Sequence, residues 1–305
     1  MDVAAPAPAV PCECARASIL KMSIDLRPHA ALSRESIARL ERALAEFYRR
    51  PPAEYYAIAD ESSGRYSPDR LPFHHHLVQQ VSPGMSVLEL GCGTAHLCPY
   101  VKQRGGRYTG MDYSPGLLEE NRRRFPGARF HLIGTPMDET FDLVVSLYAI
   151  EHVPDPPAYL DRLWAHCRPG GLIGIICPEF IRCPGLPPSV YYGQTPRRLR
   201  EKVRTASIVD ALQHLIELKI IAPRWKARIL AGPPGGFWMN LRPAVLNGGP
   251  YTIDADAIHL VGLRDLLWYF RSRGADIVHT SDDHRDLPVE VARYNCYVLA
   301  RKPQR

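Results

Sequence analysis

From residue 86 onward, short apolar runs alternate with helix-like stretches, and this rhythm constrains the fold more than any other feature of the sequence. Repeated strand–helix–strand units form parallel sheets, because each helix carries the chain back across one face of the sheet. The run Phe141–Leu147 is continuously apolar apart from Asp142 and Ser146, which is typical of a strand covered on both faces. We therefore predict an α/β fold with a doubly wound sheet.

The apolar runs predict seven strands and four helices, with Ser114 as the N-cap of the second helix. The strands are expected at Ser86–Leu90, Arg107–Met111, Arg129–Ile133, Phe141–Leu147, Leu172–Cys177, Ala275–Ser281 and Arg293–Arg301. The helices are expected at Ala95–Arg104, Pro115–Phe125, Pro156–Cys167 and Val261–Arg273. The short charged connection Asp282–Val291 suits an antiparallel pair. The predicted sheet is therefore mostly parallel, with an antiparallel last strand.

The alternation is interrupted over residues 181–260, which contain helix-like stretches and Pro/Gly-rich connections. We interpret this segment as a helical cap inserted after the fifth strand, where it would lie beside a bound substrate. Residues 81–180 and 261–305 then form the sheet domain, and residues 35–80 supply helices that cover it. Residues 1–34 begin with an Ala/Pro-rich stretch and are expected to form a flexible tail.

The first predicted strand ends at the closely spaced glycines Gly91 and Gly93. Glycines at the carboxyl end of a strand let the backbone approach a ligand closely. The second strand finishes at Asp112, whose carboxylate can accept hydrogen bonds from both hydroxyls of a ribose. A plain tight turn and a helix-capping aspartate form the alternative interpretation. Taken together, these residues predict a nucleoside-containing ligand.

A dinucleotide is the competing ligand for such a turn. Its fingerprint requires a third Gly or Ala where this chain has His96. Glu89 stands where a dinucleotide-binding strand commonly carries an apolar residue, and a carboxylate there would repel a pyrophosphate. S-adenosylmethionine carries a sulfonium and an ammonium and has no phosphate. The charge of the turn therefore favours S-adenosylmethionine.

Four segments resemble, in order, the motifs of class I S-adenosylmethionine-dependent methyltransferases. The segments are Glu89–Thr94 (ELGCGT), Tyr108–Ser114 (YTGMDYS), Phe141–Ser146 (FDLVVS) with Ile150–Val153 (IEHV), and Leu163–Gly171 (LWAHCRPGG). The resemblance is good over residues 80–180 and loose over residues 260–303. It implies a Rossmann-like methyltransferase fold that uses S-adenosyl-L-methionine as its cofactor.

The resemblance also implies roles for the residues around the glycine turn. The turn Gly91-Cys92-Gly93 would pass under the methionine part of the cofactor, and Asp112 would hold the ribose. Glu89 would order the turn and face the amino end of the cofactor, directly or through water. All five residues are therefore expected to bind the cofactor.

Three further residues complete the predicted cofactor site by the same resemblance. Tyr113 is expected to lie against the adenine, and the backbone around Ser146 to contact the amino acid moiety. The family often places an acidic residue after the third strand, to meet the adenine amine. This chain departs from that pattern, so Thr135 or a backbone carbonyl would have to substitute.

The loop after the fourth strand is where a methyl acceptor should arrive, because ligands collect at the carboxyl ends of such strands. His152 lies on this loop and titrates near neutral pH, which makes it the candidate catalytic base. The alternative is that Glu151-His152 only holds the loop by hydrogen bonds. Some relatives bind a divalent metal through a Glu-x-x-Glu-His cluster. Here Tyr148 occupies the first glutamate position, so we expect no metal.

Two residues outside this loop are candidate substrate ligands. Glu179 follows the fifth strand and points toward the same rim, where it would bind substrate or pair with an arginine of the insertion. Trp238 belongs to a set of aromatic residues that would wall the pocket or pack the cap onto the sheet. The consecutive residues His74, His75 and His76 would fan around a helix rather than converge on one metal.

Composition narrows the classes of protein that remain. No apolar run approaches the roughly 20 residues that span a bilayer, and the N-terminus lacks the pattern of a secretion signal. The eight cysteines are scattered without Cys-x-x-Cys pairs, which favours reduced thiols in a cytoplasmic protein. The net charge of +6 is mild and disfavours a nucleic-acid partner.

The sequence predicts transfer of a methyl group to a small molecule, at an oxygen atom. An RNA or protein methyltransferase is the alternative enzyme, and a catalytically silent scaffold that binds the cofactor is the alternative of another class. No feature of the sequence predicts an oligomeric state.

Overall fold

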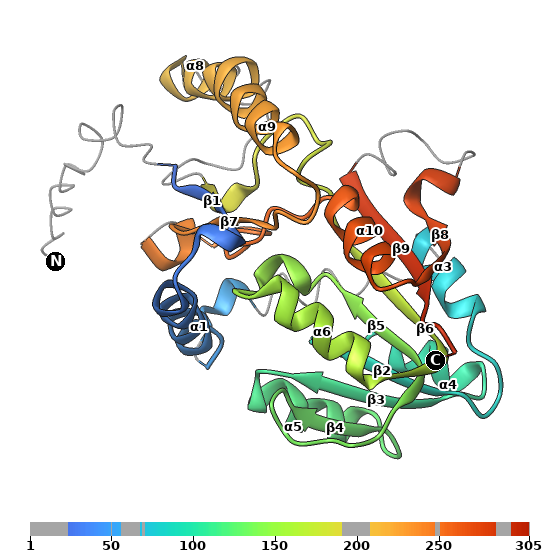
Figure 1. Ribbon diagram of the computed structural model, residues 1–305. Coiled ribbons are helices and arrows are strands. Elements are labelled where there is room, and N and C mark those ends of the chain that lie inside the picture. Colours follow the sequence, from blue (N-terminus) through green and yellow to red (C-terminus); the bar gives the residue numbers. More distant parts are fainter. Residues whose placement is uncertain are drawn as a thin grey trace, which may run out of the picture.

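A central twisted sheet is flanked by helices, and the N-terminal segment and the insertion pack together beside it (Figure 1). The computed structural model describes residues 24–49, 51–55, 68, 71–190, 208–247, 251–284 and 294–304. None of the described helices is both long enough and apolar enough to cross a membrane.

The sheet has seven strands in the order β4-β3-β2-β5-β6-β9-β8. Their bounds are Ser86–Leu90 (β2), Arg107–Asp112 (β3), Arg129–Leu132 (β4), Phe141–Leu147 (β5), Cys167–Pro178 (β6), Asp276–Thr280 (β8) and Asn295–Arg301 (β9). Strands β2 to β6 pair in parallel, and β9 runs antiparallel to both β6 and β8. The predicted mostly parallel sheet with an antiparallel last strand is confirmed. The strand order reverses between β2 and β5, so the carboxyl ends of these strands border a crevice.

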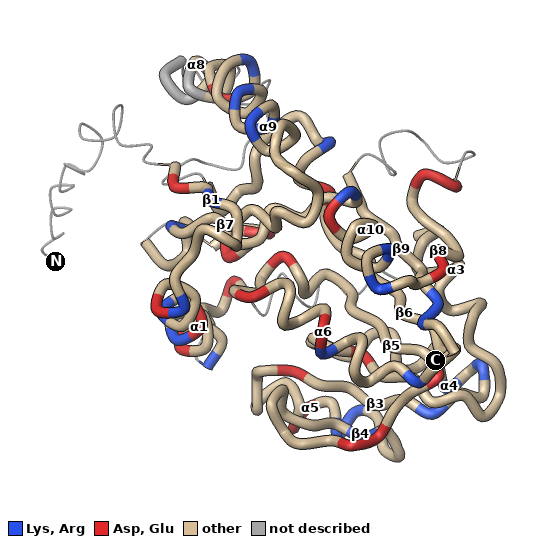
Figure 2. The backbone as a smooth tube through the Cα atoms, viewed as in Figure 1, with Lys and Arg blue, Asp and Glu red and all other residues tan. Residues whose placement is uncertain are grey.

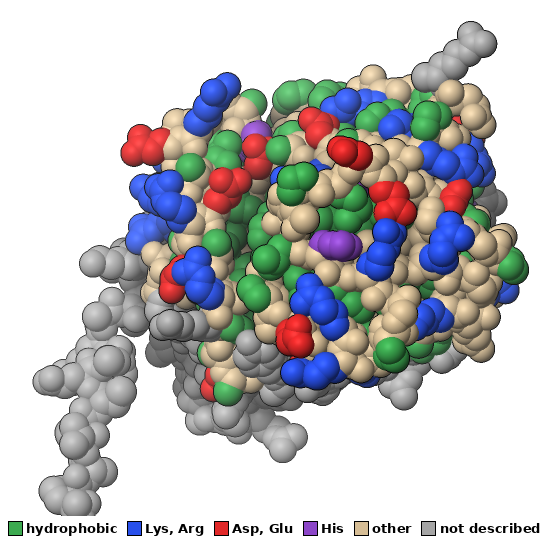
Figure 3. Space-filling view, turned by 90° about the horizontal axis from the view of Figure 1, so that it is seen from below, with side chains coloured by type: hydrophobic (Ala, Val, Ile, Leu, Met, Phe, Trp, Pro, Cys, Tyr) green, Lys and Arg blue, Asp and Glu red, His purple; other side chains and the backbone are tan. Residues whose placement is uncertain are grey.

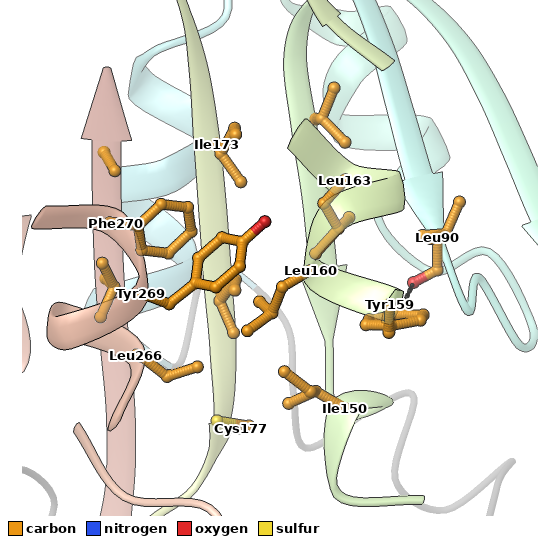
Figure 4. Packing of buried hydrophobic residues seen from close by; sticks show 14 of the residues in the cluster. Leu90, Ile150, Tyr159, Leu160, Leu163, Ile173, Cys177, Leu266, Tyr269 and Phe270 are labelled. Carbon is orange, nitrogen blue, oxygen red and sulfur yellow. Dashed lines mark hydrogen bonds between the residues drawn. The ribbon is translucent and has the colours of Figure 1, made fainter. Parts of the chain in front are cut away.

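Helices cover both faces of the sheet and enclose two apolar cores. On one face lie α3 (Pro72–Gln79), α4 (Cys98–Gln103) and α5 (Pro115–Arg124), and on the other lie α6 (Pro156–His166) and α10 (Leu263–Ser272). Figure 4 shows Leu160 and Leu163 of α6 facing Leu266 and Phe270 of α10 across Ile173 of β6. Adjacent strand residues alternate between the two cores, with Val87 in one and Leu88 in the other. This burial of both faces explains the continuous apolar runs.

Two predicted element boundaries differ from the structure by more than two residues, and local geometry gives the reasons. Helix α4 begins at Cys98 rather than Ala95, because Ala95 has φ +54°, outside the helical region. Strand β6 begins at Cys167 rather than Leu172, because Cys167 pairs with Phe141 before a register shift. The predicted N-cap of α5 is confirmed, since the Ser114 side chain accepts a hydrogen bond from the backbone of Leu117.

The prediction of a flexible tail over residues 1–34 is wrong for residues 24–34. Strand β1 (Leu26–Pro28) pairs antiparallel with β7 (Trp238–Asn240) of the insertion, and α1 (Arg34–Arg49) follows. Leu26 is buried among apolar residues of the insertion, and this burial offsets the cost of ordering the segment. Residues 1–23 lie outside the described residues.

The predicted helix-like stretch of the insertion is described only from residue 208. There α8 (Ile208–Ile216) continues through a π-helical turn (η5, Glu217–Ile221) into α9 (Ala222–Ala231). Four tyrosines of the predicted cover (residues 35–80) and cap (residues 181–260) lie outside the described residues: Tyr56, Tyr66, Tyr191 and Tyr192. The division into cover, sheet domain and cap remains a prediction.

Candidate active site

The carboxyl ends of β2, β3 and β5 meet α1 and the insertion around a pocket of 460 Å³, which we call the carboxyl-end pocket. Its lining combines strand-end residues with aromatic and acidic residues from the N-terminal segment and the insertion. Lining residues include Tyr48, Tyr55, Gly91, Gly93, Asp112, Tyr113, Ile133, Gly134, Tyr148, Ala149, His152, Arg162, Tyr251 and Asp256. The structure therefore brings together four of the predicted cofactor residues and the predicted base.

The glycine turn exposes its backbone to this pocket. Gly91 and Gly93 have φ of +76° and +47°, a region that side-chain-bearing residues rarely adopt. The amides of Gly91 and Cys92 donate to the carbonyl of Met111 at 2.8 and 2.9 Å, which fixes the turn against β3. A Cβ atom at Gly93 would meet no atom within 4 Å, so the backbone there faces open space. Cys92 is buried and lies outside the pocket lining.

Asp112 ends β3 at the wall of the pocket. One of its carboxylate oxygens accepts from the amide of Gly93 at 2.8 Å, and the other accepts from the amide of Ser114 at 2.9 Å. Burial raises the pKa of Asp112, and these amide donors limit the rise. The carboxylate is thus aimed at the pocket by the two turns that flank it.

Glu89 does not line the pocket. It is buried and accepts a hydrogen bond from the hydroxyl of Tyr108. Burial raises the pKa of Glu89 to about 8, although the hydrogen bond from Tyr108 opposes the rise. A cationic ligand nearby would lower this pKa again. The charge argument made from the sequence therefore applies to the ionised form of Glu89, and a cationic ligand nearby favours that form.

Of the three residues expected at the adenine and amino acid ends of the site, Tyr113 lines the pocket, whereas Thr135 and Ser146 do not. Tyr113 lines the pocket and is half-exposed, whereas Ile133 and Gly134 line it in place of Thr135. Ser146 is buried, and its hydroxyl lies 2.9 Å from the hydroxyl of Tyr159, which also donates to the carbonyl of Leu90 (Figure 4). Ser146 thus contacts a lining residue instead of the pocket.

His152 lines the carboxyl-end pocket and ends the short 3₁₀ turn Ile150–His152. Its Nδ1 lies 3.4 Å from Asp256, and its Nε2 lies 3.7 Å from Glu151, beyond hydrogen-bond reach. Burial lowers the pKa of His152, but the carboxylates of Asp256, Glu151 and Asp254 outweigh it, so the net pKa is raised. Asp256 was not predicted, because no local pattern in the sequence marks an aspartate in a long connection as part of a site.

Carboxylates and tyrosines from separate segments surround this histidine. Asp256 accepts a hydrogen bond from the hydroxyl of Tyr48 at 2.6 Å, and Tyr251 lies in edge contact with Tyr55 at 5.5 Å. Both carboxylate oxygens of Glu151 are buried and lack a hydrogen-bond partner among the described residues. Burial raises the pKa of Glu151 to about 8. The surroundings of His152 in the pocket are therefore both acidic and aromatic.

These acidic residues bear on the expectation of no metal. Donor atoms of Glu151, His152 and Asp254 all lie within 4.8 Å of one another, close enough to hold a cation. We expected no metal because Tyr148 stands where some relatives have a glutamate ligand. The sequence did not indicate that Asp254 of the insertion would bring another carboxylate to the same place. The absence of a metal remains a prediction.

The two predicted substrate ligands lie away from the pocket lining. Glu179 is buried, and its carboxylate accepts from the backbone amides of Ile181, Arg182 and Leu263. Trp238 is buried in β7, with its ring 6.4 Å from that of Trp225 in edge geometry. The contacts of Glu179 hold the start of the insertion against α10, and the contact of Trp238 with Trp225 packs β7 against α9.

Residues 63–280 match the family described as "Methyltransferase domain". This match spans more than half of the chain and contains the glycine turn, Asp112 and His152. The chain belongs to the class I S-adenosylmethionine-dependent methyltransferases. The cofactor of this family, S-adenosylmethionine, agrees with the cofactor predicted from the sequence.

Several curated methyltransferases are similar to part of this chain. Malonyl-[acyl-carrier protein] O-methyltransferase of Serratia marcescens is 35% identical over 96 residues, covering 30% of this chain and 37% of that protein. Trans-aconitate 2-methyltransferase of Deinococcus radiodurans is 35% identical over 100 residues, covering 32% and 39%. The alignments thus span less than two fifths of the length of these relatives. A solved methyltransferase from Mesorhizobium loti has a TM-score of 0.49 and 18% identity, covering 77% of this chain and 100% of that one.

The carboxyl-end pocket of this methyltransferase fits S-adenosylmethionine in three respects. Its volume falls in the range of about 300–1,000 Å³ typical of small-molecule sites. The open space over Gly93 allows a ligand to rest on the backbone of the turn. Asp112 presents a carboxylate at the pocket wall beside the glycine turn, as a ligand for ribose hydroxyls would have to. The residues present therefore suit the cofactor of the family.

Gly91→Ala is expected to destabilise the protein by roughly 2–5 kcal/mol, because its Cβ would lie 2.5 Å from Cβ of Ala149 while φ stays positive. The thermal midpoint of unfolding measures the effect. Gly84→Ala is the matched control, since Gly84 has φ +83° and a Cβ there would meet no atom within 4 Å. Equal losses in the two variants would contradict the steric argument.

Proposed function

We propose that this methyltransferase transfers the methyl group of S-adenosylmethionine to an uncharged hydroxyl group of a small molecule. The observation that carries this proposal is the position of His152 in the carboxyl-end pocket, beside Asp256. The cofactor would be held by Gly91, Gly93 and Asp112, with Tyr113 against the adenine.

The surroundings of His152, where the acceptor would bind, favour a neutral acceptor over an anionic one. Asp256, Glu151 and Asp254 gather there, whereas Arg162 is the one arginine or lysine in the lining drawn from the described residues. A carboxylate acceptor would be repelled by these groups when they are ionised. The tyrosine rings nearby suit the flat apolar body of a small acceptor.

A hydroxyl acceptor also gives His152 a chemical task. When bound, the cofactor supplies a methyl group activated by its positively charged sulfur. As the acceptor oxygen bonds to the methyl carbon and the carbon–sulfur bond breaks, Nε2 of His152 would take the hydroxyl proton. Asp256 faces Nδ1 and would stabilise the protonated ring. The pocket walls would hold the oxygen in line with the breaking bond.

An RNA or protein acceptor is less well supported. Charged residues of both signs are spread over the helices and connections (Figure 2). On the face in Figure 3, lysines and arginines are interspersed with aspartates and glutamates. Nucleic-acid binders usually gather basic residues on one face. Trans-aconitate 2-methyltransferase, a relative named above, is named for a small-molecule acceptor, which points in the same direction.

The proposal predicts methyl ethers as products. Purified protein with S-adenosylmethionine would be offered matched sets of small phenols and alcohols, carboxylic acids and amines, with products found by mass spectrometry and the methylated atom assigned by NMR. We expect transfer to hydroxyl compounds. Transfer confined to carboxylates or amines would contradict the acceptor assignment. Cofactor binding without any product across all three sets would instead favour a cofactor-binding scaffold.

A further inference from the structure

Three histidines from separate elements converge at the edge of the sheet, away from the carboxyl-end pocket. His76 lies on α3, His279 on β8, and His284 directly after the 3₁₀ turn Ser281–Asp283. Ligand nitrogens of the three rings all lie within 4.8 Å of one another. The ring centroids are 4.1 Å (His76–His279), 4.6 Å (His279–His284) and 5.7 Å (His76–His284) apart. Figure 1 shows α3 and β8 side by side, as these contacts require. None of the three histidines lines the carboxyl-end pocket.

The nitrogens of this cluster are arranged as metal ligands commonly are. Nδ1 of His76 lies 2.8 Å from the hydroxyl of Tyr297, so a proton on Nδ1 can be donated there while Nε2 keeps its lone pair. Ligating histidines usually have such a partner for the second nitrogen. Nε2 of His279 and Nε2 of His284 are buried and have no hydrogen-bond partner among the described residues. Buried polar atoms without partners are uncommon, and a bound cation would satisfy both.

The charge state of the cluster also suits a metal. Burial, together with repulsion from His279, His284 and His75, lowers the pKa of His76 to about 4. Burial and His279 lower the pKa of His284, although Asp283 opposes this. Imidazole binds metals in its neutral form, and the lowered pKa values of these two rings favour that form. Asp283 is not counted among the ligands, because its carboxylate accepts hydrogen bonds from the amide and hydroxyl of Thr280.

We propose that His76, His279 and His284 form a binding site for a divalent transition metal of the zinc type, which tethers α3 to the edge of the sheet. Three imidazoles suit Zn²⁺, Ni²⁺ or Cu²⁺ and are a poor set for Mg²⁺ or Ca²⁺. Zinc–nitrogen bonds of about 2.0–2.1 Å would draw the rings together, and water would complete a tetrahedral site. The proposal is independent of the methyl-transfer reaction.

The test uses the full chain after chelator treatment, titrated with Zn²⁺ by calorimetry and with Co²⁺ by visible absorption. We expect one zinc ion per chain at this site, a Co²⁺ spectrum typical of tetrahedral coordination, and a rise of several degrees in the thermal midpoint with excess Zn²⁺. His279→Ala should weaken Zn²⁺ binding at least 100-fold and abolish the stabilisation. His284→Ala, at the end of an element, is a second variant in case the first does not fold.

Two control variants distinguish this site from the donor group in the carboxyl-end pocket. His75→Ala removes an exposed histidine from the same helix and should leave Zn²⁺ affinity unchanged. Glu151→Gln alters the other group of donors that the described residues bring together. Binding that survives in folded His279→Ala and His284→Ala but is lost in Glu151→Gln would assign the ion to the carboxyl-end pocket and overturn the proposal. Absence of Zn²⁺ binding would reduce the cluster to ring packing against Phe73 and Tyr297.

Discussion

Asp112→Ala is expected to weaken S-adenosylmethionine binding by roughly 100-fold or more. The carboxylate stands at the pocket wall, where it can accept hydrogen bonds from both ribose hydroxyls. Hydrogen bonds to charged groups contribute about 1.5–3 kcal/mol each, and about 1.4 kcal/mol corresponds to a tenfold change in affinity. Calorimetric titration of the purified variant with the cofactor measures the loss directly.

Asp112 also orders the glycine turn, so its two contributions must be separated. Asn121→Ala removes the hydrogen bond from Asn121 to the carbonyl of Gly93, at 2.7 Å, without touching the predicted ribose ligand. This variant should cost much less affinity than Asp112→Ala. Asp138→Ala changes an exposed aspartate outside the pocket lining and should have no effect. Unchanged affinity in a folded Asp112→Ala protein would refute the assignment.

The sheet could be predicted from the sequence because its strands are buried on both faces. Strands β2 and β5 have the predicted bounds, and their residues are almost entirely buried. The errors arose where a single backbone conformation or a pairing partner decides a boundary. Ala95 with its positive φ delays α4, and the pairing of Cys167 with Phe141 lengthens β6. Neither feature leaves a pattern of hydrophobicity in the sequence.

The presence of Gly91, Gly93 and Asp112 at one pocket could be predicted for a related reason. Gly91, Gly93 and Asp112 lie at the ends of strands, so placing the strands also places these residues. The acceptor side could not be predicted in this way. Tyr48 and Asp256 are 208 positions apart in the chain, yet a hydrogen bond of 2.6 Å joins them. Only the folding of the N-terminal segment and the insertion around the sheet brings them together.

The histidines of α3 show the same limit. The consecutive residues His74, His75 and His76 do fan around the helix, since the ring of His74 stacks on Tyr148 while His75 is exposed. The partners of His76 come instead from β8 and the turn after it. A spacing rule applied to neighbouring residues cannot find donors that meet only through a sheet edge.

His152→Ala is expected to lower kcat by about 100-fold to 10,000-fold while cofactor affinity stays within about twofold, because general-base catalysis contributes a factor of this size. Turnover of the best hydroxyl acceptor and calorimetric titration with the cofactor provide the two readouts. His131→Ala, at a histidine of β4 outside the pocket lining, is the matched control and should retain full activity. Unaltered kcat in His152→Ala would limit His152 to holding its loop.

The pH profile distinguishes a base from a structural residue. A base acts when it is neutral, so kcat/KM should rise with pH through the pKa of His152. Burial lowers that pKa, but Asp256, Glu151 and Asp254 raise it above the ordinary value of about 6.5. Asp256→Asn removes one of these carboxylates, so the pKa should fall and the acid limb should move to lower pH. A profile that keeps the same acid limb in both Asp256→Asn and His152→Ala would contradict proton transfer to His152, because the titrating group would then lie elsewhere.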